Sequence, residues 1–140
     1  MKTISTPAAP APAGHYSQAI THDGLVYVSG QLPIDPATRT PCNGPIEEQT
    51  ELALRNLAAI LESAGSSIDR VLKTTVYVSD IGLWGRVNAA YSTFFGEHRP
   101  ARSVVPTREL HFGCLIEIDA IAAVSGSAKA SDGEGQTLNL

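Results

Sequence analysis

Two side chains of opposite charge stand fifteen residues apart late in the sequence, Arg102 within residues 100–104 and Glu117 within residues 115–122. They lie in adjacent strand-like segments. The planar guanidinium of an arginine grips a carboxylate through two parallel, charge-assisted hydrogen bonds. A glutamate among apolar residues can orient a water molecule or take a proton from it. The pair therefore indicates a site that holds a small anion and activates water, unless both side chains merely lie on the solvated face of a sheet.

Other catalytic signatures are missing from the sequence. No GxGxxG or GxxxxGK[ST] segment occurs, so we expect no nucleotide cofactor, and Ser29, in the tripeptide VSG, lacks the first glycine of a GxSxG motif. Cys42 and Cys114 lack CxxC spacing and are expected to be ordinary thiols. The histidines show neither HxH nor HExxH spacing and have no acidic cluster beside them, so no metal is expected. They are His15, His22, His98 and His111.

Length and composition indicate an ordinary globular chain. It has 140 residues, 43% hydrophobic and 17% charged, which is enough for one domain with a core that needs no disulfides. The formal net charge of -4 argues against broad binding to nucleic acids, because proteins that bind them usually carry a basic surplus. Residues 1–14 lack the continuous apolar stretch of a signal peptide or membrane span. We therefore expect a cytoplasmic protein without membrane contact.

The first part of the chain predicts a β-hairpin. Residues 17–21 and 25–29 have strand character, and the dipeptide Asp23-Gly24 between them suits a turn that requires positive φ. Two prolines within residues 31–36 predict a loop without regular structure.

Two helices with a strand between them are predicted next. Apolar residues recur with helical spacing over residues 46–64, acidic residues stand near the start, and Gly65 suits the C-cap. Residues 71–78 are β-branched and aromatic and predict a strand, after which Asp80 can cap the second helix. Two glycines weaken the first turn of that helix. Its apolar face consists of Leu83, Val87, Ala90, Tyr91 and Phe94.

Strands over residues 101–105 and 114–123 complete the order strand, strand, helix, strand, helix, strand, strand. This order predicts an α+β fold in which one mixed sheet carries two helices on one face. Residues 125–140 are rich in Ser, Gly and Ala with little to bury, which predicts a flexible tail. The chain thus divides into a Pro/Ala-rich segment (1–13), one domain (14–124) and the tail.

Five short segments, none specific alone, form a specific pattern by their order and spacing. They are VSGQ at 28–31, KTTVYV at 73–78, VNAAY at 87–91, PARS at 100–103 and IEIDAIA at 116–122. Together they resemble the Rid (reactive intermediate deaminase) family, in particular its RidA branch, which is also labelled endoribonuclease L-PSP. The resemblance runs from about Gly14 to Val124.

The resemblance implies roles for particular residues. Arg102 matches the arginine that binds the substrate carboxylate, and Glu117 matches the acidic residue that places the attacking water. Three more residues match positions that line the same pocket, namely Tyr16, Gly30 and Asn88. Taken without the resemblance, these three have plainer explanations: a half-buried strand aromatic, a glycine needed for backbone geometry, and a helix-surface amide.

An activity and an assembly are implied as well. Members of the family hydrolyse 2-imino acids and their enamine tautomers, such as 2-iminopropanoate and 2-iminobutanoate, to 2-oxo acids and ammonia without a cofactor. They are typically homotrimers of chorismate-mutase-like subunits whose sheets surround a central barrel, with active sites in the clefts between subunits. Tyr16 is then expected to face Arg102 of a neighbouring copy.

Two positions depart from the family pattern. Val104 stands where many members have a cysteine, so water handling is expected to depend on Glu117. His111 stands where the family commonly has proline, and we expect it to be exposed rather than in contact with substrate. Backbone N–H groups from Ser103 to Val105 are a further expected part of the anion site.

Two other functions stay open. Endoribonuclease activity, a label that some relatives carry, has little support because the chain is acidic and shows no histidine pair. The other is a binding module that senses a small carboxylate metabolite without turning it over, which Val104 makes more plausible. The expected partners are therefore a small imino or oxo acid and further copies of the chain.

Overall fold

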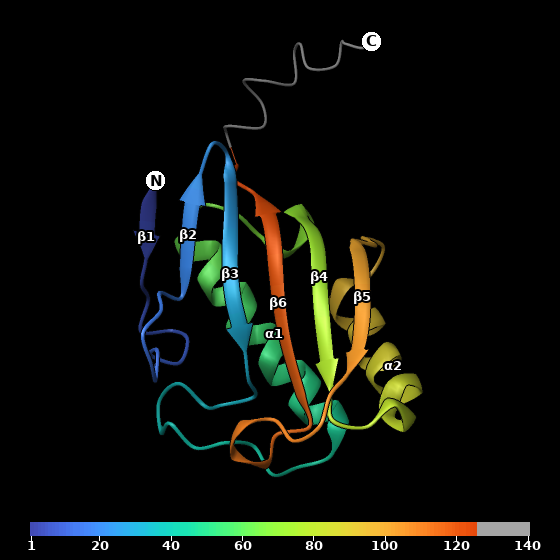
Figure 1. The fold of residues 1–140 in the computed structure, drawn as a ribbon. Helices are drawn as coiled ribbons and strands as arrows, with labels where there is room; N and C mark the ends of the chain where they lie inside the picture. The colour runs from blue at the N-terminus through green and yellow to red at the C-terminus, as the bar shows by residue number, and fades with distance from the viewer. Residues whose placement is uncertain (126–140) are drawn as a thin grey trace.

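The computed structural model describes residues 1–125, which form one six-stranded sheet with two α-helices on one face (Figure 1). The strand order is β1-β2-β3-β6-β4-β5, and each neighbouring pair is antiparallel except β4 and β5. The predicted α+β fold with a mixed sheet is confirmed. The predicted tail lies outside the described residues except for Ser125. The elements are β1 Lys2–Ile4, β2 Ala19–His22, β3 Leu25–Gln31, α1 Ile46–Ser63, β4 Val71–Val78, α2 Trp84–Phe95, β5 Ala101–Pro106 and β6 Ile116–Ala123.

The N-terminal segment contributes a strand that was not predicted, since β1 pairs antiparallel with β2 along its whole length. Behind it, the buried Gln18 side chain accepts a hydrogen bond from the Thr6 N–H at 2.7 Å. The Gln18 amide nitrogen donates to the carbonyl oxygens of Thr6, Ala9 and Pro10 at 2.9 to 3.4 Å. A three-residue strand is too short to show a pattern, and this long-range amide contact orders the Pro-rich chain that follows it.

The predicted hairpin is present. β2 and β3 pair antiparallel, and Asp23 and Gly24 turn the chain with φ values of 50° and 80°. Two successive residues with positive φ form the kind of two-residue turn that Asp-Gly favours. β2 begins at Ala19, two residues later than predicted, and β3 continues to Gln31.

The loop after β3 is more regular than predicted. Gln31 still belongs to β3, and Ile34 forms an isolated β-bridge with Pro41. The buried side chain of Asn56 on α1 donates to the carbonyl oxygens of Leu32 at 3.2 Å and Ile34 at 2.9 Å. This contact between distant parts of the chain orders the loop backbone despite its prolines.

Both helices lie where they were predicted. α1 ends at Ser63, one residue early, and Gly65 follows with a φ of 82°. A 3₁₀ turn, Ile81–Leu83, precedes α2, and in it the Asp80 carboxylate accepts a hydrogen bond from the Gly82 N–H at 2.8 Å. The predicted cap therefore stabilises this turn and not α2 itself. Among the described residues, no helix is long and apolar enough to span a membrane.

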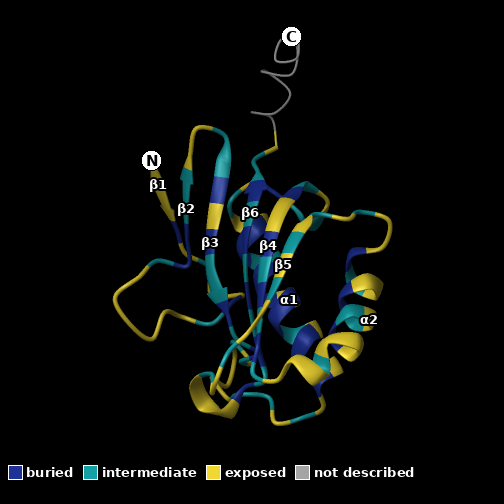
Figure 2. Ribbon diagram, turned by 45° about the vertical axis from the view of Figure 1, so that its right-hand side comes forward, coloured by how far each residue is buried: buried dark blue, intermediate teal, exposed yellow. Residues whose placement is uncertain are grey.

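The helices cover one face of the sheet and leave the other face open. Buried and partly exposed residues alternate along β6, so Ile116 and Ile118 face the helices while Glu117 and Asp119 face away from them. Exposed and intermediate segments also recur along β3, β4 and β5 (Figure 2). The open face therefore carries ionisable side chains that take no part in packing the hydrophobic core.

Candidate active site

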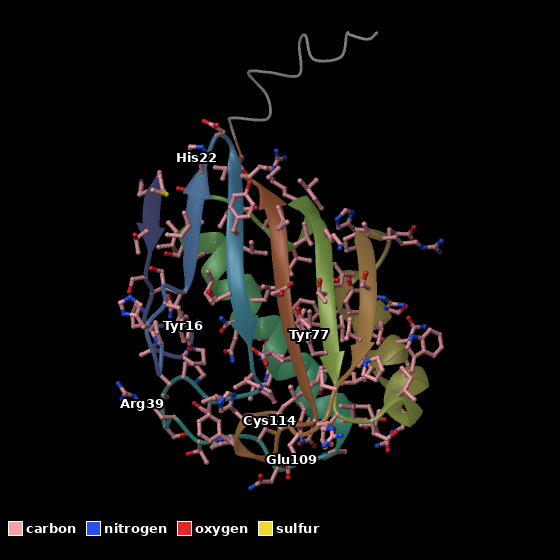
Figure 3. The ribbon with its side chains drawn as sticks, in the orientation of Figure 1. Tyr16, His22, Arg39, Tyr77, Glu109 and Cys114 are labelled. Carbon is pink, nitrogen blue, oxygen red and sulfur yellow. The ribbon has the colours of Figure 1, made fainter. Side chains whose placement is uncertain are left out.

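Arg102 and Glu117 do not lie on neighbouring strands, contrary to the sequence-based expectation. β4 runs between β5 and β6, and it pairs Thr74 with Arg102 and Tyr77 with Glu117. Side chains alternate along a strand, so positions three residues apart point to opposite faces. Thr74 is buried against α2, whereas Tyr77 lies on the open face (Figure 3). The Arg102 and Glu117 side chains thus lie on opposite faces of the sheet. Their Cα atoms are roughly 14 Å apart, because they are separated by two strand spacings across the sheet and by three residues along the strands.

The first half of the candidate site surrounds Arg102. Its Nη1 donates to Oδ1 of Asn88 on α2 at 3.0 Å. Its guanidinium carbon lies 4.8 Å from the centre of the Tyr91 ring, which is cation–π geometry. The Tyr91 hydroxyl lies 2.7 Å from Oγ1 of Thr74, and both of these residues are buried. Asn88 and Tyr91 therefore fix the orientation of the guanidinium, and Thr74 fixes the orientation of Tyr91.

Arg102 has no acidic partner within residues 1–125. It lines a cavity of about 420 Å³ together with Asn88, Tyr91, His98 and Arg99. Its other N–H groups form no hydrogen bond with any described residue, so they remain available to a bound carboxylate. The ion pairs in this part of the chain are His22–Asp23, Arg55–Glu51 and Arg86–Glu47.

The second half of the candidate site is a cavity of about 390 Å³ around Glu117. It lies between the open face of the sheet, the segment before β2 and the turn before β6. Within the described part of the chain, no side chain forms a hydrogen bond or ion pair with the Glu117 carboxylate. Both a small organic acid and water molecules fit this volume. Its lining includes Tyr16, Ser29, Gly30, His111 and Phe112.

Gly30 is needed for close approach, and its φ does not lie in the positive range. A Cβ atom added at Gly30 would overlap Oε2 of Glu117 and lie 3.0 Å from its carboxyl carbon. The pairing of β3 with β6 also slips between Val28 and Gln31, which places Gly30 at a β-bulge. Bulges of this kind are common beside active sites. Because Gly30 has no side chain, the Glu117 carboxylate can occupy the space beside it.

The environment of Glu117 raises the pKa of its carboxyl group. Burial raises the pKa of the carboxyl above its ordinary value of 4.5, the charge of His111 opposes this rise, and Asp119 adds to it. A carboxylate whose conjugate acid has a raised pKa is a stronger base once ionised. Glu117 is therefore suited to taking a proton from water.

Tyr16 lines the Glu117 cavity and does not line the Arg102 cavity. It precedes β2, is 51% exposed, and is not a strand residue. Its hydroxyl oxygen accepts a hydrogen bond from the Ala13 N–H at 3.3 Å. Figure 3 shows it on the side of the sheet remote from β5. Within one chain, then, Tyr16 and Arg102 are separated by the width of the sheet.

Ser103 and Val104 lie on opposite sides of β5. Ser103 pairs with Thr75 and is exposed, whereas Val104 packs partly against the core. β5 is the last strand of the sheet, so the backbone N–H groups on its outer side have no strand partner among residues 1–125. These groups are available to a ligand or to another copy of the chain.

Neither cavity offers a cluster suited to a metal. Among residues 1–125, no three His, Cys, Asp or Glu side chains come together in a way that would hold a metal ion. Cys42 and Cys114 are free thiols, and burial raises the pKa of Cys114. The polar groups present are a guanidinium, hydroxyls, an amide and a carboxylate, which suit an organic anion.

Several residues of these cavities were not singled out from the sequence. Tyr91 was assigned to an apolar helix face, although a buried tyrosine hydroxyl usually has a polar partner. Ser29 lies in the segment VSGQ, which by itself indicates no function for this hydroxyl. Phe112 is 59% exposed and has a φ of 61°, and no sequence signal marks it because positive φ is uncommon for bulky residues. His111 is exposed, as predicted, yet it lines the cavity of Glu117.

Known proteins are similar to this chain over most of its length. The sequence model of the family described as endoribonuclease L-PSP matches residues 6–124. A RutC family protein from Pyrococcus abyssi is 46% identical over 121 residues, which cover 86% of this chain and 95% of the relative. A protein from Rattus norvegicus named 2-iminobutanoate/2-iminopropanoate deaminase is 45% identical over 121 residues, covering 86% of this chain and 88% of the relative.

The fold recurs in solved structures. E. coli TdcF with bound serine superposes with a TM-score of 0.85 at 35% identity, over 89% of this chain and 100% of that chain. RidA from an Antarctic Psychrobacter species superposes with a TM-score of 0.85 at 36% identity, over 89% and 100% of the two chains. The sheet and helices that position both cavities are therefore common to these proteins.

Proposed function

The chain belongs to the endoribonuclease L-PSP family, and from this premise we propose that it hydrolyses small 2-imino acids and their enamine tautomers to 2-oxo acids and ammonia. The observation that carries the proposal is Glu117, a partly buried carboxyl with a raised pKa that projects into a cavity and pairs with no described side chain. Rat and mouse relatives named for the 2-iminobutanoate/2-iminopropanoate activity support this substrate class.

Arg102 is the proposed anchor for the substrate carboxylate. Asn88 and Tyr91 already hold its guanidinium, so binding an anion costs little additional side-chain entropy. The absence of a carboxylate partner within the described residues leaves its charge available to the ligand. The edge N–H groups of β5 near Ser103 and Val104 add donors to the same anion site.

Because the two cavities lie on opposite faces, a complete site requires a second copy of the chain. In the assembly that we propose, a homotrimer, the open faces of the sheets turn inward and surround a barrel. Edge strand β5 of one copy then brings Arg102 to the Glu117 cavity of the next, where Tyr16 faces it. The open face supports this arrangement because a monomer leaves Tyr27 and Val105 43% and 38% exposed.

The chemistry needs little beyond positioning, because an imine carbon is already electrophilic. Glu117 takes a proton from water while the new C–O bond forms, and the C=N electron pair moves to nitrogen, which is protonated. The resulting carbinolamine then loses ammonia as its C–N bond breaks and the carbonyl forms. Val104 has no ionisable proton, so the base in this scheme is Glu117. The reaction balances without an oxidant or a cofactor.

A coupled assay tests this function. An amino-acid oxidase generates the imine from alanine or 2-aminobutanoate, and oxo-acid formation is compared with and without the purified protein. We expect faster formation of the oxo acid in its presence. If the protein leaves the decay of every small imino acid unchanged, the proposed activity is wrong.

Gly30→Ala should lower kcat by roughly 10²-fold, because a shift of about 1 Å in a catalytic group can cost that much. The added methyl group displaces the Glu117 carboxylate, the nearest atoms to the new Cβ. A matched control is Gly85→Ala, since no atom lies within 4 Å of the Cβ position there. Steady-state kinetics of both variants check the prediction, and equal kcat values would contradict it.

Binding of a small carboxylate without turnover is a second candidate, favoured by the serine held by the related E. coli protein TdcF. A thermal-shift screen with 2-oxo acids separates the two functions, because stabilisation without imine hydrolysis indicates a sensor.

Endoribonuclease activity is supported only by the name of the family. The formal net charge of -4 argues against it, because proteins that bind nucleic acids usually carry a basic surplus. The cytoplasmic location stays a prediction from the sequence.

A further inference from the structure

We propose that His111 is the general acid of this site and protonates the substrate nitrogen. The inference deepens the proposed imine hydrolysis and rests on it. Glu117 can remove a proton from water, but the nitrogen must gain one in the same step. Tyr16 and His111 are the other ionisable side chains that line the Glu117 cavity. Of these two types, an imidazolium is a far stronger acid than a phenol.

The turn before β6 places His111 at the cavity. His111 opens the 3₁₀ turn His111–Gly113, in which Phe112 and Gly113 have φ values of 61° and 72°. These two residues reverse the chain before β6 begins, so His111 does not continue the line of the strand. His111 is one of the residues that line the same cavity as Glu117, which comes from β6. An acid and a base are thereby brought to one space from neighbouring segments.

Contacts to α1 anchor this turn. The Cys114 N–H donates to the His111 carbonyl oxygen at 3.1 Å, and Cys114 itself is buried. The next N–H, of Leu115, donates to Oε1 of the buried Gln49 side chain at 2.8 Å. The amide nitrogen of Gln49 donates to the Gly44 carbonyl oxygen at 3.0 Å. The backbone beside His111 is therefore held, which restricts the positions open to its imidazole.

The charges around His111 suit a proton donor. Glu117 lines the cavity from β6 and Tyr16 lines it from the segment before β2. Asp119 lies two residues along β6 on the same face as Glu117, and Arg108 and Glu109 precede the turn. His111 is close enough to Glu117 for its positive charge to lower the pKa of that carboxyl, against the opposite effects of burial and Asp119. A carboxyl group and an imidazole group are thus brought to the same cavity.

The two groups complete the reaction with every proton accounted for. In the addition step Glu117 takes a proton from water, the C–O bond forms, and the imidazolium of His111 gives its proton to nitrogen. In the collapse step protonated Glu117 gives its proton to the amine, neutral His111 takes the hydroxyl proton, and the C–N bond breaks to release ammonia. Both residues return to their starting states.

Two histidine variants test the assignment in the 140-residue chain. His111→Ala should lower kcat by roughly 10²-fold, the lower end of the range for a positioned proton donor, because the cavity is open to water. KM should change little, since Arg102 holds the carboxylate. Added imidazole should restore part of kcat, because His111 is exposed and its place can be reached from solvent. The control is His22→Ala, an exposed histidine on the hairpin turn at the other end of the sheet (Figure 3).

Each result decides the assignment. A fall in kcat that imidazole reverses in His111→Ala, with His22→Ala unchanged, supports it. An unchanged kcat overturns it and leaves the proposed hydrolysis standing. A fall in kcat that imidazole does not reverse also overturns the assignment, because the loss would then come from an altered geometry of the turn. Inactivity of the unmodified protein overturns the proposed function itself.

Discussion

Arg102→Ala should reduce kcat/KM for 2-imino acids by roughly 10²- to 10⁴-fold. Two hydrogen bonds to a charged group, worth about 1.5–3 kcal/mol each, are lost together, and about 1.36 kcal/mol corresponds to tenfold in rate. Most of the loss should appear in KM, because the carboxylate anchor acts on the bound substrate as well as on the transition state. Steady-state kinetics with imine generated in the assay measure both parameters.

Two further arginine variants make this result specific. Arg102→Lys should recover only part of the activity, because an ammonium group keeps the charge but lacks the planar fork. Arg55→Ala removes an exposed arginine on α1 that pairs with Glu51, and it should leave the kinetics unchanged. Unaltered kinetics of Arg102→Ala would remove this residue from the site and require another anion anchor.

Glu117→Gln should reduce kcat by roughly 10²- to 10⁴-fold, the range for loss of a positioned acid–base group. In the unmodified protein the active base is the ionised carboxylate, so activity should fall as the pH drops through the pKa of Glu117. Burial raises that pKa, and the acid limb should therefore lie above pH 4.5. Initial rates over a pH series locate the limb, which should disappear in Glu117→Gln.

Asp119→Asn is the matched test of this pH dependence. Asp119 lies two residues along β6 and raises the pKa of Glu117 by like-charge repulsion. Without that charge the pKa falls, and the acid limb should move to lower pH. An acid limb that stays in place in Asp119→Asn, or survives in Glu117→Gln, would show that another group titrates.

Mixing the two inactive variants tests whether the site is shared between copies. Chains carrying Arg102→Ala and chains carrying Glu117→Gln are unfolded, mixed in equal amounts and refolded. If a site takes Arg102 from one copy and Glu117 from another, about a quarter of randomly assembled sites are intact. Activity should then return to about that fraction. Persistent inactivity, when the unmodified protein regains its activity after the same refolding, would show that no site combines Arg102 and Glu117 from different copies.

Local patterns were sufficient for most of the secondary structure. The strand at residues 71–78 was predicted with its observed bounds, α1 within one residue, and the Asp23-Gly24 turn with its positive φ. In each case the signal lies within a few residues of the chain. β1 escaped prediction because it is only three residues long and depends on pairing with β2, fifteen to nineteen residues along the chain. The ordered loop after β3 escaped prediction because the buried amide of Asn56 holds it from a distant position.

Residue types alone indicate which chemical groups this protein can use, because a guanidinium, a carboxylate and an imidazole keep their bonding preferences wherever the chain places them. Which of these groups meet depends on how distant segments pair. β4 entered between β5 and β6, and its register put Arg102 and Glu117 on opposite faces. Side chains alternate along a strand, so pairing between distant segments assigns the face, and a one-residue slip would reverse it. The same folding brought His111 and Glu117 to one cavity.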